Sequence, residues 1–329
     1  MINKKVLFIA PRYFSYENDI ISALEKRGAL VYFVQENIDA TELRFKILNK
    51  VSYKIRDLLI RNHFINIFNR FHKDKVTFDY IFCIRIDSFD VVILSKLKEL
   101  YPNANYICYF WDSIKNMRKP ETIADFFDKI FTFDKNDAKR KGWYFNPLFY
   151  NERYGQCLSC TNKKIDVLFV ASLLPERARI YTKLKEICER YKLKLYAYFT
   201  VNPYLLIANK NKFNNIPSSI IHFRGLSQKE LVNLFSISNV IMDCSSSSQS
   251  GLTMRTIECI GAKKKLITTN PCIKDYDFYN ERNIFLVNEN SIDKKLVDFL
   301  SNDTYEELES DKYRYYSIDS WIERIFSKN

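Results

Sequence analysis

Three short segments at the start of the chain decide its fold: Lys5-Val-Leu-Phe-Ile-Ala10, Asn18-Asp-Ile-Ile-Ser-Ala-Leu-Glu-Lys-Arg-Gly28 and Leu30-Val-Tyr-Phe-Val-Gln35. The first and third are continuous apolar runs, which are typical of strands covered on both faces. The second has helical spacing and ends at a glycine. A strand, a helix and a strand within 35 residues predict the opening of a parallel α/β sheet.

The same alternation continues along the chain. After a long helical stretch over 41–73, the pattern predicts strand Tyr80–Ile86, helix Phe89–Tyr101, and strands Tyr106–Trp111 and Lys129–Phe133. It restarts after residue 164. The second set of expected strands is Asp166–Ala171, Lys194–Thr200, Ile220–Phe223, Val240–Cys244, Lys265–Thr269 and Ile284–Val287. The expected helices are Arg177–Tyr191, Gln228–Phe235, Gly251–Gly261, Ile292–Leu300 and Ile318–Phe326.

The segment 146–164 has no sustained period and is the predicted boundary between two domains. The first domain is expected over 1–150 and the second over 151–315, with 316–329 as a C-terminal helix that could pack back on the first domain. We therefore expect an α/β protein of two Rossmann-like, doubly wound parallel-sheet domains that face a cleft. Ligands of such sheets bind at the carboxyl ends of the strands.

Composition narrows the functional classes. The chain has 329 residues, of which 47% are apolar and 27% charged, and this composition excludes a disordered chain. It holds only 6 glycines and neither common glycine-rich phosphate motif, so a nucleotide must be held in some other way. The net charge of +12 admits nucleic acid, an anionic membrane surface or a phosphorylated substrate.

The cysteines and the N-terminus predict a cytoplasmic protein. The first apolar run is too short for a signal peptide, and no stretch is long and apolar enough to span a membrane. Most of the 8 cysteines lie inside apolar runs, as expected for reduced, buried thiols. Cys157 and Cys160 form one Cys-x-x-Cys pair without a second, so no zinc site is expected.

One segment of the second half carries the pattern of an anion site. A predicted strand ends at Cys244, a polar loop follows over Ser245–Ser250, and the next helix is expected to begin near Gly251. Free backbone N–H groups and the helix dipole would then favour a phosphate, with Arg255 adding a charge-assisted contact. One turn further, Glu258 could accept hydrogen bonds from a ribose. A serine helix cap with a salt bridge at Glu258 fits the pattern equally well.

These residues resemble a known family. Gln249-Ser-Gly-Leu-Thr-Met-Arg-Thr-Ile-Glu258, together with 264–270 and Tyr276-Asp-Phe-Tyr279, is similar to the donor-site signature of bacterial lipopolysaccharide and capsule glycosyltransferases related to the CgeB-like group, which have the GT-B fold. The start of the second half at 166–172 and the segment Tyr109-Phe-Trp-Asp-Ser113 resemble the same family. The resemblance extends from about residue 80 to most of the remaining chain.

The resemblance implies a transferase without an essential metal or cofactor. Its domain 151–315 would bind a nucleotide-sugar donor, and 1–150 would form the acceptor side. The acceptor would be a lipid-linked or oligosaccharide precursor of lipopolysaccharide, capsule or O-antigen. The implied donor-binding residues are Arg177, Arg179, Gln249, Ser250, Gly251, Thr253, Arg255 and Glu258. Ser250 stands where several retaining families carry the first glutamate of a Glu-x7-Glu pair, which leaves the stereochemical outcome open.

An inverting enzyme needs a base for the acceptor hydroxyl. Asp112, at the end of a predicted strand, is the first candidate, followed by Asp87 and Asp19, although each could equally cap a helix. Asp275-Tyr-Asp277 matches the metal-binding Asp-x-Asp pattern, but three residues match by chance too often to carry a metal site.

The stretch 42–75 is basic and amphipathic. It has nine lysines and arginines against three acids, and apolar residues recur in it at helical spacing. Such a helix could lie on an anionic inner membrane face, or pack its apolar stripe on its own domain. Nucleic acid is not expected as a partner, because no recognised motif accompanies the charge. A nucleotide-sugar epimerase of the same fold and a non-catalytic nucleotide- or partner-binding scaffold are the alternative functions.

Overall fold

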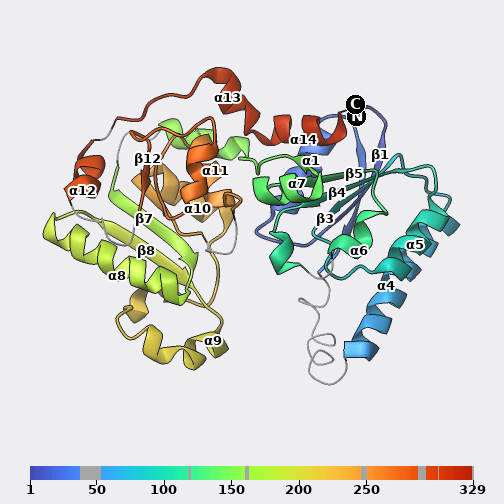
Figure 1. Cartoon of the computed structure of the whole chain (residues 1–329), viewed down its shortest axis with the longest axis horizontal. Coiled ribbons are helices and arrows are strands. Elements are labelled where there is room, and N and C mark those ends of the chain that lie inside the picture. Colours follow the sequence, from blue (N-terminus) through green and yellow to red (C-terminus); the bar gives the residue numbers. More distant parts are fainter. Residues whose placement is uncertain are drawn as a thin grey trace. The chain divides into compact units, whose positions relative to one another are not determined.

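The computed structural model describes residues 1–37, 53–117, 120–159, 163–245, 250–287, 294–302 and 304–327. The chain divides into two units, one of Met1–Pro147 with Trp321–Asn329, and one of Leu148–Ser320 (Figure 1). Each is built on a parallel sheet of six strands with helices packed on it. The predicted pair of doubly wound α/β folds is confirmed.

The sheet of the first unit has the strand order β2-β1-β3-β4-β5-β6. Its strands are β1 (Lys5–Ala10), β2 (Leu30–Gln35), β3 (Tyr80–Ile84), β4 (Asn105–Phe110), β5 (Lys129–Thr132) and β6 (Tyr144–Phe145). Its helices are α1 (Tyr16–Glu25), α4 (Tyr53–Lys73), α5 (Val91–Leu100), α6 (Pro120–Ala124) and α7 (Lys135–Lys141), with a 3-10 turn at Ile114–Asn116. The apolar runs that predicted β1, β3 and β4 are buried, as expected for strands covered on both faces.

The sheet of the second unit has the order β12-β11-β10-β7-β8-β9. Its strands are β7 (Ile165–Ser172), β8 (Leu195–Thr200), β9 (Ile221–His222), β10 (Ser238–Asp243), β11 (Lys265–Thr268) and β12 (Ile284–Leu286). Its helices are α8 (Pro175–Arg190), α9 (Pro203–Ala208), α10 (Gln228–Ser236), α11 (Met254–Gly261), α12 (Lys294–Ser301) and α13 (Ser310–Tyr315).

The last helix, α14 (Ile318–Phe326), returns the end of the chain to the first unit. Trp321 is fully buried there, with its ring centroid 4.9 Å from that of Tyr109. Arg324 Nε donates to Asn146 Oδ1 at 2.7 Å, and Lys129 Nζ donates to the carbonyl of Ser327 at 2.8 Å. The first unit is therefore assembled from both ends of the chain.

The basic stretch predicted over 42–75 is helical in its described part, α4, while 38–52 lies outside the described residues. Phe64 and Phe68 of α4 are fully buried in the core of the first unit. Ile55 and Leu58, nearer the start of the helix, are 52% and 54% exposed. The later turns therefore pack on their own domain, and the first turns leave apolar side chains on the surface.

Two predicted boundaries are wrong for local reasons. β3 ends at Ile84 rather than Ile86, because Arg85 adopts a left-handed backbone with φ 45°. Helix α11 begins at Met254 rather than Gly251, because the Thr253 side chain accepts from the Thr256 N–H and caps the helix there.

Candidate functional site

A buried carboxylate fixes the start of α11 at the carboxyl end of the second sheet. Asp243, the last residue of β10, is 7% exposed. Its Oδ2 accepts hydrogen bonds from Thr253 Oγ1 at 2.6 Å and from Thr256 Oγ1 at 2.7 Å. The helix that carries Arg255 and Glu258 is therefore anchored to the strand end, where ligands of parallel sheets bind.

Arg255 and Glu258 form a salt bridge one turn into this helix. Arg255 Nη1 lies 2.7 Å from Glu258 Oε2, and the Glu258 side chain is only 1% exposed. The Arg255 guanidinium also lies 5.3 Å from the ring centroid of Phe235. This is the salt-bridge alternative allowed by the sequence, so a ribose hydroxyl or a phosphate would have to share or replace one side of the pair.

The residues around Gly251 form a turn and not a helix start. The Asn270 side chain donates from Nδ2 to the carbonyl of Gly251 at 3.3 Å, which ties this turn to the segment after β11. Gly251 is buried and Ser250 is half-buried, while Gln249 lies outside the described residues. The expectation that the dipole of α11 starts at Gly251 is therefore wrong. In the same segment, the Thr269 hydroxyl is buried, and it lies close enough to the Cys244 thiol to offset part of the rise that burial gives the pKa of that thiol.

Arg177 joins two strand ends. Its Nε donates to the carbonyl of Cys244 at 3.1 Å, and its Nη1 donates to the carbonyl of Ser172 at 3.0 Å. Burial raises the pKa of the Cys244 thiol, although the nearby charge of Arg177 opposes that rise. Arg179 is exposed on α8, where no ion pair or hydrogen bond involves its side chain among the described residues. The structure thus brings Arg177 to the strand ends and leaves Arg179 facing solvent.

In the first unit, two of the three predicted catalytic aspartates lie around one arginine. Arg85 Nε lies 3.0 Å from Asp87 Oδ2, and Arg85 Nη1 lies 3.5 Å from Asp112 Oδ2. Burial opposes the charge of this guanidinium, but Asp87, Asp112 and Glu36 together raise the pKa of Arg85. Asp19 is not among the carboxylates that act on Arg85, and it is buried in the first turn of α1.

The two aspartates differ in how their oxygens are used. Asp112 Oδ1 accepts from the Ser113 N–H at 2.9 Å and from Asn116 Nδ2 at 2.9 Å, so it contacts the following 3-10 turn without capping it, because Ser113 holds the N-cap position. Asp87 Oδ1 is buried and accepts no hydrogen bond from any residue that the structure describes. Asp87 therefore has one oxygen, Oδ1, without a donor among the described residues, whereas both oxygens of Asp112 have partners.

Exposed aromatic rings follow the neighbouring strand ends. Tyr13 and Phe14, just after β1, are 54% and 52% exposed. The Tyr13 ring centroid lies 6.4 Å from that of Trp111, the residue after β4. Phe14 has a left-handed backbone with φ 50°. Flat apolar rings beside carboxylates suit the apolar face of a sugar.

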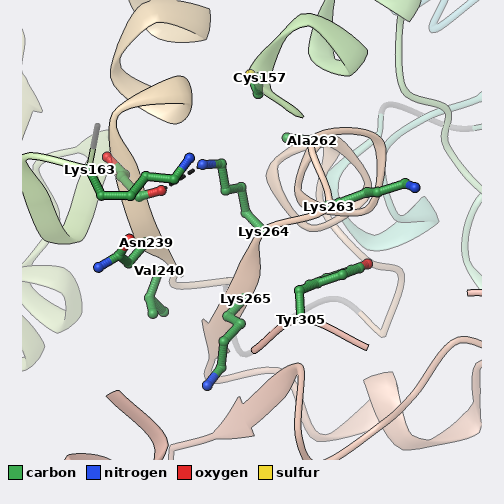
Figure 2. Close-up of a pocket in the computed structure, with 10 residues that line it drawn as sticks. Cys157, Lys163, Asn239, Val240, Ala262, Lys263, Lys264, Lys265 and Tyr305 are labelled. Carbon is green, nitrogen blue, oxygen red and sulfur yellow. Dashed lines mark hydrogen bonds between the residues drawn. The ribbon is translucent and has the colours of Figure 1, made fainter. Parts of the chain in front are cut away.

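Two lysines of the run 263–265, Lys264 and Lys265, bind the ends of helices, while Lys263 pairs with Glu307. The run lines a pocket of about 140 Å³ at the amino ends of β10 and β11 (Figure 2). Lys264 Nζ and Lys163 Nζ both donate to the carbonyl of Ser236, the last residue of α10, at 3.2 and 2.8 Å. Lys265 Nζ donates to the Phe299 carbonyl of α12 at 2.6 Å. Cations at helix C-termini are stabilising, so these lysines have a structural role.

Several residues of these sites were not predicted: Arg85, Asp243, Thr256, Thr269 and Asn270. Most of these residues are the last residue of a strand or directly follow one. Their position at a strand end was therefore the sequence feature that could have predicted them as site residues. Arg85 lies within the predicted strand Tyr80–Ile86. Because β3 ends at Ile84, the sequence pattern did not show that Arg85 follows a strand end.

Within the described ranges, no group of three or more histidine, cysteine, aspartate or glutamate side chains is arranged to hold a metal ion. Asp277 of the Asp-x-Asp match accepts a hydrogen bond from the Tyr316 hydroxyl. Among the helices of those ranges, none is both long enough and apolar enough to cross a bilayer.

No protein-family model and no curated protein sequence matches this chain. Solved structures do match it. An alpha-glucosyltransferase in complex with UDP and a 13-mer DNA has a TM-score of 0.61 at 12% identity over 96% of both chains. AviGT4, a glycosyltransferase involved in avilamycin A biosynthesis, has a TM-score of 0.58 at 11% identity over 98% of this chain and 95% of its own.

An enzyme of another activity has the same fold. The UDP-GlcNAc 2-epimerase from Neisseria meningitidis, bound to UDP-GlcNAc, has a TM-score of 0.54 at 12% identity over 99% of this chain and 100% of its own. Together with the two six-stranded sheets, these likenesses show that the chain has the GT-B fold. At these identities the likeness concerns the fold and leaves the reaction to be argued from the site.

Proposed function

We propose that the protein is a glycosyltransferase that moves a sugar from a nucleotide-sugar donor to a surface-glycan acceptor. One observation carries the proposal: an arginine–glutamate pair lies at the anchored start of α11, at the carboxyl edge of the second sheet. A structural neighbour is in complex with UDP and another is bound to UDP-GlcNAc, which supports a nucleotide-sugar ligand.

In this proposal the second unit binds the donor. Glu258 accepts hydrogen bonds from the ribose hydroxyls, which frees the Arg255 guanidinium to face the diphosphate. The segment with Ser250, Gly251 and Thr253 would offer backbone N–H groups to the same phosphates. Gln249, which lies outside the described residues, stays a donor contact predicted from the sequence. Arg177 and Arg179 would add positive charge as the nucleoside diphosphate leaves. Fixed positive groups of this kind stabilise the departing charge without a metal.

The first unit supplies the base for the acceptor hydroxyl. We assign this role to Asp87 ahead of Asp112, because one oxygen of Asp87 lacks a hydrogen-bond donor among the described residues. Arg85 positions the carboxylate, and Tyr13 and Trp111 offer ring faces to the acceptor sugar. Asp19 remains a weaker candidate because it is buried in α1.

The biological setting is part of the proposal. The resemblance of 249–270 to lipopolysaccharide and capsule glycosyltransferases of the CgeB-like group favours a lipid-linked or oligosaccharide acceptor on the cytoplasmic side of a membrane. The exposed apolar start of α4 would then contact that membrane.

A nucleotide-sugar epimerase is the second candidate, because a UDP-GlcNAc 2-epimerase shares the fold over the whole chain. The two candidates need the same donor site and differ in whether an acceptor is consumed. A non-catalytic scaffold would bind the nucleotide or a partner without turnover.

A thermal-shift screen of nucleoside diphosphates and their sugars tests the donor site. A ligand that binds the folded state raises the melting temperature. We expect one nucleotide to raise it clearly and to bind in calorimetry with one site per chain. If none of the common nucleotides and nucleotide sugars binds, the donor site is refuted.

A further inference from the structure

The longest stretch of the chain without an acidic residue runs from Arg190 to Lys229 in the second unit. It contains seven lysines and arginines and no aspartate or glutamate. All of it is described by the structure. Neither the donor site nor the acceptor side uses it.

Large apolar side chains are exposed at the middle of this stretch. On α9, Tyr204 is 76% exposed, Leu205 is 49% exposed and Ile207 is 77% exposed, and none of the helix's residues is buried. Phe223, just after β9, is 65% exposed. Single exposed apolar residues are ordinary, but three on the six-residue helix α9, with a fourth just after the strand β9, need an explanation.

The sheet register brings these side chains to one edge. β8 pairs with β9 so that Thr200 lies beside His222, and the Val201 N–H donates to the His222 carbonyl at 3.0 Å. Phe223 therefore follows β9 beside the residues that lead from β8 into α9. In Figure 1, α9 lies at the edge of the second unit beyond the end of β8. We call Tyr204, Leu205, Ile207 and Phe223 the α9 patch.

Positive charge accompanies the α9 patch. Lys210 and Lys212 follow α9 and are exposed, and Arg224 follows Phe223. The acid that ends the stretch, Glu230, is held by the capping box of α10, where its Oε2 accepts from the Ser227 N–H at 2.7 Å. Lysines next to exposed aliphatic and aromatic side chains match the two layers of an anionic bilayer, since the charges reach lipid phosphates while the apolar groups enter the acyl boundary.

We propose that the α9 patch is a membrane-contact site that inserts into the interface of a bilayer containing anionic lipids. Aliphatic Leu205 and Ile207 favour lipid over nucleic acid, which is held by phosphate contacts and base stacking. The strands of the second sheet are parallel, so the patch lies at the carboxyl edge that also carries Asp243 and α11. This contact is separate from the one expected of α4, and it does not depend on transferase activity.

Vesicle co-sedimentation of the full chain tests the proposal. We expect binding to phosphatidylcholine vesicles that contain phosphatidylglycerol, weaker binding without it, and weakening by salt. The double variant Tyr204→Ser/Ile207→Ser should bind about tenfold or more weakly, since two apolar side chains leave the interface. The matched variant Ile55→Ser/Leu58→Ser removes similarly exposed side chains from α4. Because this variant keeps the α9 patch, it should keep the part of the vesicle binding that the patch contributes.

Both variants should keep the melting temperature and nucleotide binding, because all four side chains are exposed. As a second measurement, Ile207→Trp should add a tryptophan emission that shifts to shorter wavelength with anionic vesicles. The proposal is overturned if the α9 double variant binds vesicles like the parent, or if the emission added by Ile207→Trp does not shift. It is also overturned if the patch instead binds a single-stranded oligonucleotide and no vesicles. Loss of transferase activity alone would leave vesicle binding intact, so the two proposals fail separately.

Discussion

At the residue scale, the proposed donor site includes a carboxylate that is already paired. Glu258 is almost fully buried and its partner Arg255 is held on the same helix face. An ion pair at a strand end can stabilise the fold, or it can open so that its two side chains bind a ligand instead. Substitution separates these roles, because only the second changes nucleotide affinity.

The variant Glu258→Gln should bind the stabilising nucleotide roughly tenfold to a hundredfold more weakly, since a hydrogen bond to a charged group contributes about 1.5–3 kcal/mol. Isothermal titration calorimetry measures the change. The control is Asp137→Asn, which breaks a similar pair with Arg140 in the first unit (2.8 Å). Asp137→Asn should destabilise its own unit and leave nucleotide affinity unchanged. Equal affinity of Glu258→Gln and the parent would remove Glu258 from the donor site.

Asp87 and Asp112 make a second pair of matched variants. Asp87→Asn should lower the transfer rate by about 10²–10⁴-fold, because an amide cannot take a proton from the acceptor hydroxyl. Asp112→Asn should cost much less, since its oxygens already serve Ser113, Asn116 and Arg85. Steady-state kinetics over a range of pH checks both. A larger loss for Asp112→Asn would restore Asp112 as the base.

Gly261 gives a prediction about stability. A Cβ atom on Gly261 would lie 2.5 Å from Cγ of Tyr150, a contact that forces the ring or the helix to move. Gly261→Ala should therefore lower the free energy of unfolding by about 1–3 kcal/mol. Gly155→Ala is the control, because a Cβ there meets nothing within 4 Å. Denaturant titration measures the free energy of unfolding of both variants. Equal values for Gly261→Ala and Gly155→Ala would disprove the close packing of Gly261 against Tyr150.

At the element scale, α11 is held by its cap and by Asp243. Thr253→Ala removes both the hydrogen bond to Asp243 and the cap, and should cost about 0.5–2 kcal/mol of stability and weaken nucleotide binding. Ser227→Ala removes the cap of α10 and should cost similar stability with unchanged nucleotide affinity. Thermal denaturation and calorimetry are read together. If both variants bind nucleotide like the parent, the position of α11 does not control the donor site.

The long elements could be predicted from sequence, because a strand of a parallel sheet shows a continuous apolar run and a packed helix shows apolar residues at helical spacing. β1, β2 and α14 begin and end where the pattern placed them. The short elements β6, α6, α7, α9 and α13 lack enough residues to show a period.

The site was predictable only in part. The pairing of Arg255 with Glu258 follows from their spacing on a helix. The contact of Asp243 with Thr253 and Thr256 joins residues that are 10 and 13 positions apart in the sequence, and Arg85 has a left-handed backbone with φ 45°. Neither feature has a signature in the local sequence, so the anchoring of α11 and the Arg85 cluster needed three-dimensional coordinates.

At the scale of the whole molecule, the end of the chain helps to build the first unit. Trp321 of α14 is fully buried against Tyr109 and Phe82. Trp321→Ala should lower the free energy of unfolding by about 3–5 kcal/mol, as for other large aromatic side chains in cores. Nucleotide affinity of the folded protein should remain, since Arg255 and Glu258, which we propose bind the donor, belong to the other unit. A folded variant with unchanged stability would show that α14 contributes little to the core.

The positive charge of the molecule is concentrated in two stretches of the sequence. Of the +12, a net +6 falls in 42–75, and a further seven basic residues without an acid lie in 190–229. Both stretches expose apolar side chains beside the charge. This distribution favours a membrane surface over nucleic acid as the partner of the basic residues.

Mass spectrometry of the purified full chain with a nucleotide sugar and a glycan acceptor shows whether a sugar is transferred from the nucleotide donor. We expect release of the nucleoside diphosphate and an acceptor heavier by one sugar, with both lost in Glu258→Gln and Asp87→Asn. A donor converted to an isomer of equal mass without an acceptor would identify an epimerase. No change in any nucleotide sugar, with the protein folded and nucleotide bound, would refute the transferase proposal and leave a binding scaffold.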